Sequence, residues 1–108
     1  MELDRTDRRR MAFLEAVERD GLESLKRRWD FNVCPKESAR KTLESAGYDF
    51  EKIWTLNARM THNPYTDRDE LAIDWRTVSY YLHQKGLISS QNVIEGVEKA
   101  VEYCKSLG

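Results

Sequence analysis

The 108-residue sequence contains few of the residues from which catalytic and metal sites are built. It has two cysteines, two histidines, two prolines and five glycines. Cys34 and Cys104 lie far apart and form no CxxC motif, which excludes a zinc site made of cysteine pairs. No glycine-rich phosphate loop is present. Because candidate acids, bases and nucleophiles are so few, we expect a protein that is not an enzyme and that uses no cofactor or metal.

The sequence also lacks long apolar runs and a strong excess of one charge. No apolar segment approaches the roughly 18 residues of a membrane helix, and no apolar stretch follows the charged N-terminus as in a secretory signal. The net charge is −1, from 18 basic and 19 acidic residues, and nucleic-acid binders usually carry a basic excess. We therefore expect a cytoplasmic protein without membrane contact, for which nucleic acid is a disfavoured partner. In that compartment Cys34 and Cys104 are expected to be buried free thiols.

What remains is typical of a helical domain. Hydrophobic residues make up 40% of the chain and charged residues 34%, which suits a globular protein of one domain. Apolar residues recur at helical spacing, and alternation with a period of two never extends beyond a few residues. The sequence predicts a single all-α domain over residues 1–108, a compact bundle of about five helices with no sheet.

Cap and turn residues set the predicted boundaries. Asp20-Gly21 is a predicted break in the first helix, Gly47 a predicted helix end, and Asp49 a predicted N-cap. Pro64 favours a loop at 62–66 because it disfavours the helical conformation at Asn63. The predicted helices cover residues 8–29, 36–46, 50–60, 67–85 and 91–107, with Thr6 capping the first and Thr66 and Ser90 capping the last two.

The predicted helix over 67–85 is apolar on two sides. One stripe is expected to face the core, and the remaining apolar side chains are free to contact a partner. Aromatic residues often anchor protein interfaces. We therefore expect a small accessory or regulatory protein that binds a protein partner or a second copy of itself. The residues assigned to this aromatic face are Trp54, Tyr65, Ile73, Trp75, Tyr80 and Tyr81.

A DNA-binding alternative rests on two short resemblances. The segment TVSYYLHQKGLI, residues 77–88, resembles the end of a winged-helix recognition helix, although a helix is predicted after it in place of the two strands of a wing. The segment ARKTLESAGYDFEKIWTLNAR, residues 39–59, resembles the helix-turn-helix of small repressor-like and phage packaging proteins, and also a ubiquitin-associated domain. The helix-turn-helix resemblance implies a DNA-binding regulator, and its expected DNA contacts are Arg40, Lys41, Lys52, Arg59 and Arg76.

Three further patterns are weak candidates for a metal site, a phosphorylation site and a nucleophile. His62, Tyr65, Asp67, Asp69 and Glu70 lie close together and offer ligands for a metal ion. Acidic residues are, however, also expected at the start of a helix for electrostatic reasons alone. His83 with Lys85 resembles the phospho-accepting site of histidine phosphotransfer domains, but the spacing is one residue short, which rotates a helical side chain by about 100°. Cys34 precedes a predicted helix, where a thiolate would be stabilised, yet no base is placed beside it.

Overall fold

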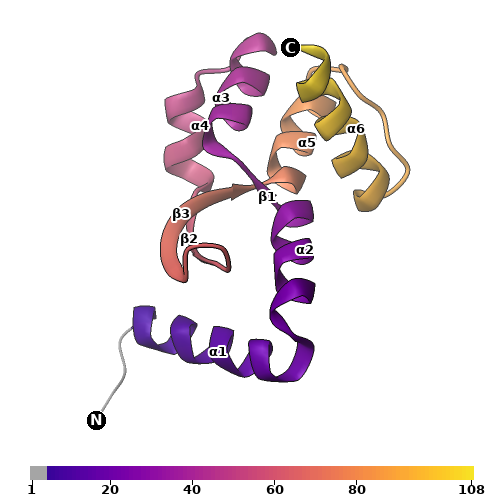
Figure 1. Cartoon of the computed structure of the whole chain (residues 1–108). Coiled ribbons are helices and arrows are strands. Elements are labelled where there is room, and N and C mark those ends of the chain that lie inside the picture. The colour runs from indigo at the N-terminus through magenta and orange to yellow at the C-terminus, as the bar shows by residue number, and fades with distance from the viewer. Residues whose placement is uncertain (1–4) are drawn as a thin grey trace.

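The computed structural model describes residues 5–108, and the side chains of residues 7–108. Within this range six helices and three short strands form two parts, a helical core with a small sheet and an N-terminal pair of helices that extends away from it (Figure 1). The elements are α1 (Arg5–Asp20), α2 (Leu22–Asn32), β1 (Val33–Cys34), α3 (Lys36–Ser45), α4 (Phe50–Asn57), β2 (Arg59–Asn63), β3 (Arg68–Asp74), α5 (Trp75–Gln84) and α6 (Val93–Ser106).

The prediction of about five helices without a sheet is wrong. Strands β2 and β3 form an antiparallel hairpin whose register runs from Arg59 opposite Ala72 to Asn63 opposite Arg68. Strand β1 pairs antiparallel with the other edge of β3, so the strand order is β1-β3-β2. The predicted helix 50–60 ends at Asn57, and the first half of the predicted helix 67–85 is β3.

The missed hairpin has a physical explanation in its short strands. Two strands of five and seven residues give too little alternation to compete with a helical pattern. The turn between them places Asp67 at a φ of 54°, a left-handed conformation that aspartate tolerates better than most residues. Helix α5 begins only where Asp74 accepts a hydrogen bond from the Arg76 backbone N–H at 2.8 Å. Asp74 is therefore the N-cap, and Thr66 is not.

Several predicted boundaries are confirmed. Helix α1 ends at Asp20 and Gly21 follows with a φ of 79°, so the expected break is present. Asp49 caps α4 through hydrogen bonds from the backbone N–H groups of Glu51 and Lys52, at 3.1 and 3.4 Å. The last helix is capped by Asn92, which accepts from the Glu95 N–H, and not by the predicted Ser90.

The core lies between helices α3 to α6 and strands β1 and β3. Its fully buried side chains include Leu43, Phe50, Ile73, Val78 and Leu82. Both cysteines are free and buried here, as expected. Burial raises the pKa of the Cys34 thiol far above its ordinary value, and the nearby Cys104 adds to the effect. Cys34 is therefore held as an uncharged thiol, which argues against the nucleophile suggested by its position.

Helices α1 and α2 form an arm that contributes no buried side chain to this core. The arm extends below the core in Figure 1, and the molecule measures 48 × 26 × 25 Å along its principal axes. Among the described residues, no helix is long and apolar enough to cross a membrane.

Truncating a core leucine should destabilise the protein far more than truncating a surface leucine. Leu43 is fully buried on α3, whereas Leu56 on α4 is 67% exposed. We expect Leu43→Ala to lower the free energy of unfolding by about 2–5 kcal/mol, because it leaves a cavity. Leu56→Ala is the matched control and should stay within about 0.5 kcal/mol. Urea unfolding followed by circular dichroism measures both, and equal losses would contradict the assigned core.

Gly96 on α6 packs closely against Ser79 on α5 and Ser90. A Cβ at this position would lie 2.7 Å from Ser79 Oγ and 3.1 Å from Ser90 Oγ. Because Ser79 is buried, we expect Gly96→Ala to cost about 1–3 kcal/mol of unfolding free energy through overpacking. Adding Ser79→Ala removes the closest of these atoms and should restore part of the loss. A double-mutant cycle by thermal unfolding tests this, and strictly additive effects would contradict the proposed contact.

Candidate functional site

A groove of about 600 Å³ separates the arm from the hairpin. We call it the arm groove, and its walls are α1, α2 and the β2–β3 hairpin, with β1 contributing at one end. The residues that form its apolar surface are Ala12, Phe13, Ala16, Leu25, Trp29 and Met60.

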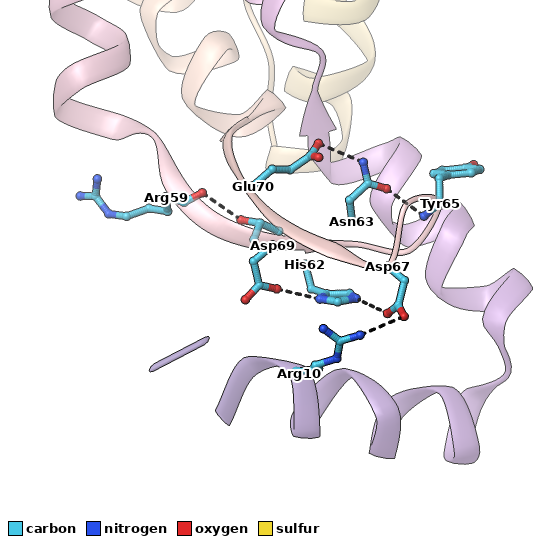
Figure 2. Close-up of polar contacts among 9 residues, drawn as sticks. Arg10, Arg59, His62, Asn63, Tyr65, Asp67, Asp69 and Glu70 are labelled. Carbon is cyan, nitrogen blue, oxygen red and sulfur yellow. Dashed lines mark hydrogen bonds and ion pairs between the residues drawn. The ribbon is translucent and has the colours of Figure 1, made fainter. Parts of the chain in front are cut away.

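A buried histidine on the hairpin faces α1, as Figure 2 shows. The two ring nitrogens of His62 face two carboxylates, Nδ1 at 2.7 Å from Asp69 Oδ1 and Nε2 at 3.0 Å from Asp67 Oδ1. A neutral imidazole has a single N–H and can donate to only one of them, whereas a doubly protonated ring donates to both. The side chains of His62 and Asp69 are only 7% and 6% exposed. The His62–Asp69 pair is therefore a buried polar contact, and losing either side chain would leave the other buried without this hydrogen bond.

Contacts from α1 complete this cluster. The Phe13 ring lies against the His62 ring with centroids 3.9 Å apart. Arg10 donates to Asp67 Oδ2 at 3.4 Å, but both side chains are more than half exposed, so this ion pair adds little. The apolar contact between Phe13 and His62 is the stronger link between α1 and the hairpin.

A second link joins the hairpin turn to α2. The Tyr65 hydroxyl donates to Asp30 Oδ2 at 2.6 Å, and this hydrogen bond is the main reason why the pKa of Tyr65 is raised. The Lys26 ammonium lies 5.2 Å from the centre of the Tyr65 ring, within the range of a cation–π contact. The hairpin therefore contacts both helices of the arm.

The charges that line the arm groove are mostly positive. Arg9, Arg19, Arg28 and Arg59 line it together with a single carboxylate, Asp74. Asp74 is already paired with Arg76 at 2.9 Å.

These arginines differ in how far they are neutralised. Arg19 forms two hydrogen bonds to Asp20, which lower the pKa of that carboxyl, and Arg28 approaches Asp20 at 3.9 Å. Arg59 Nη1 donates only to the Leu56 and Ala58 carbonyls among the contacts the structure describes. Arg9 Nη1 is buried, and within the described part of the chain it has no hydrogen-bond partner. The arm groove is thus an apolar surface bordered by incompletely neutralised cations.

The structure does not bring the six predicted aromatic-face residues onto one surface. Ile73 and Trp75 are 1% and 6% exposed and belong to the core. Trp54 and Tyr81 are partly buried against it, and Tyr81 accepts a hydrogen bond from Asn57 Nδ2. Tyr65 and Tyr80 are exposed, but Tyr65 lies in the hairpin turn and Tyr80 on α5.

The five predicted DNA contacts also come from several elements. Lys41 and Lys52 are exposed on α3 and α4. Arg40 lies 3.6 Å from Glu37 and 3.8 Å from Glu51, while Arg76 pairs with Asp74. Arg59 lies on β2 at the arm groove.

His62, Asp67 and Asp69 lie close together in the sequence, but their contact with the arm has no local sequence signal. Among the described residues, no group of three histidine, cysteine or acidic side chains is arranged to hold a metal ion. The hairpin register sets His62 opposite Asp69, and recognising the strands would have revealed the pair. Phe13, Arg9 and Arg28 were missed because nothing local in the sequence indicates that α1 and α2 contact the hairpin. His83, near the end of α5, is exposed, in contrast to the buried side chain of His62.

Comparison with protein-family models, with curated proteins and with solved structures finds no match for this chain.

Removing the His62 ring should destabilise the hairpin and the arm. His62→Ala leaves Asp69 buried without its hydrogen bond and removes the contact with Phe13. We expect a loss of about 2–4 kcal/mol in the free energy of unfolding, with faster backbone hydrogen exchange in α1. His83→Ala is the matched control, because His83 is exposed. A loss no larger than that of the control would show that the cluster is not structural.

Proposed function

We propose that this chain is a small, non-catalytic protein-binding module of the cytoplasm, with an accessory or regulatory role, and that the arm groove is its binding surface. The observation that carries the proposal is the arm itself. Helices α1 and α2 flank an apolar groove, yet none of their described side chains is buried.

An uncovered arm of this kind is energetically unusual. Helices of this length are marginally stable alone in water and are normally stabilised by packing an apolar face. Met11, Leu14, Leu22 and Phe31 are between 39% and 54% exposed. Clusters of exposed apolar side chains on a folded protein often mark an interaction surface. A protein partner that fills the groove would pack against the inner faces of α1 and α2, and one that extends beyond the groove would also cover these exposed side chains.

The arm groove replaces the aromatic face as the proposed surface. Ile73 and Trp75 are 1% and 6% exposed and offer a partner almost no surface, although Ile73 lies among the residues that line the arm groove. Trp29 and Phe13, which line the groove, are aromatic residues only partly covered by the chain itself. Arg28 and Arg59 add charged groups of the kind that is enriched in protein interfaces.

DNA binding remains the second candidate because of one local arrangement. Helices α3 and α4 are joined by a short turn at Gly47, and the β2–β3 hairpin follows directly after α4. In a winged helix two strands follow the recognition helix. No such strands follow residues 77–88 in the part of the chain that the structure describes, but the β2–β3 hairpin does follow α4. The charges oppose this reading, because residues 33–74 contain six basic and eight acidic residues.

Site-specific photo-crosslinking distinguishes the two candidates. A photo-reactive amino acid at Leu25 reports on the arm groove, and one at the exposed Thr55 reports on the outer face of α4. In living cells we expect protein adducts at Leu25 and none at Thr55, with adduct masses measured by mass spectrometry. Nucleic-acid adducts at Thr55 that disappear at raised salt would instead favour DNA binding. The absence of any protein adduct at Leu25 would contradict the proposed function.

A further inference from the structure

The outer face of α1 combines apolar and acidic side chains. Met11 and Leu14 are 49% and 54% exposed, and Glu15 and Glu18 are exposed beside them. Their spacing of three and four residues places Met11, Leu14 and Glu18 on one side of the helix. Ala12 and Ala16 line the arm groove from the opposite side. Helix α1 therefore presents Met11 and Leu14 outward, with Glu15 and Glu18 toward its C-terminal end and the exposed Arg8 and Arg10 toward its N-terminal end, and it forms the groove wall with its inner face.

This outer face is complementary to the arm groove. The groove offers apolar surface from Leu25 and Trp29, with Arg28 on α2 and Arg59 on β2 from two of its walls. Glu15 and Glu18 have the opposite charge to these arginines, and such complementarity directs and orients association. The same arm thus carries exposed apolar side chains beside two glutamates and forms walls of a groove lined by arginines.

We propose that the arm groove receives α1 of a second copy of this chain, so that two arms clasp each other in a two-fold dimer. The proposal rests on the proposed function and names the partner. In a two-fold interface each contact occurs twice, so each α1 enters the groove of the other copy. One association event then covers Met11 and Leu14 and fills both grooves.

The apolar surface favours this occupant over a phosphate backbone. A nucleic acid would satisfy Arg28 and Arg59 but would leave Met11 and Leu14 exposed. A different protein could fill the groove, yet it would have to supply an apolar acidic segment that this chain already carries beside the groove. The tests that follow distinguish a second copy of the chain from a nucleic acid and from a different protein.

The first test is the mass of the full chain by sedimentation equilibrium from micromolar to millimolar concentration. We expect a reversible dimer. Leu14→Gln removes an exposed apolar side chain with little effect on helix propensity, and it should weaken the dimer at least about tenfold, since a buried aliphatic side chain contributes roughly 1.5–3 kcal/mol. Leu56→Gln on α4 is the matched control, because Leu56 is 67% exposed and lies outside the arm, and it should leave the dimer unchanged.

The second test exchanges the charges. One variant carries Glu15→Arg and Glu18→Arg, and the other carries Arg28→Glu and Arg59→Glu. Each alone should lose dimer affinity by on the order of a hundredfold, because like charges then face each other. An equimolar mixture should form a heterodimer, because every face again meets a groove of opposite charge. Glu98→Arg with Glu102→Arg, an exposed pair on α6, is the control and should dimerise like the parent chain.

The outcomes separate this inference from the proposed function. A parent chain that stays monomeric throughout, or a dimer insensitive to both charge exchanges, would overturn the two-fold dimer. If crosslinking at Leu25 then yields a heavier adduct with another protein, the groove is still a protein-binding site and only its occupant was misassigned. A Leu25 adduct of twice the chain mass, together with the mixing result, would support both.

Discussion

Strand β3 is the element on which the rest of the structure depends, because it is hydrogen-bonded along both edges. Strand β2 pairs with one edge and β1 with the other. Its last residue, Asp74, caps α5, and Ile73 just before it is buried in the core. The same strand carries Asp69, which holds His62 in place against α1. Strand β3 therefore contributes both to the helical core and to the contact with the arm, and a change in its pairing would alter both parts.

The sequence was sufficient to predict those features whose causes lie within a few residues. The Asp49 cap, the Gly21 break and the end of α3 near Gly47 each depend on a local side chain or on the backbone freedom of glycine. The Val78 and Leu82 stripe was also correct, since both side chains are fully buried. Local periodicity is a reliable guide where a helix contacts the core along one side.

The errors arose where tertiary contacts override local patterns. Nothing local in the sequence indicates that Val33 and Cys34 pair with Asp74 and Ile73, about forty residues further along the chain. The spacing of Leu71, Trp75 and Val78 suits a helix, but β3 ends at Asp74 and only the later residues are helical. The candidate site was hidden for the same reason. Phe13 and His62 are far apart in the sequence, and their ring contact depends on how the arm lies on the hairpin.

Charge segregation shows why whole-chain composition is a poor guide to the surface of this protein. The net charge of −1 conceals an arm, residues 5–32, with eight basic and six acidic residues, beside residues 33–74 with the reverse balance. Within the arm, Arg9, Arg19 and Arg28 line the groove, while Glu15 and Glu18 are exposed on α1. Screening confines the effect of exposed charges to about 8–10 Å at physiological salt, so a partner responds to these local patterns and not to the total. Near-neutrality therefore weakens the case for a long polyanionic partner, while it leaves a surface of alternating charge that suits contact between two arms.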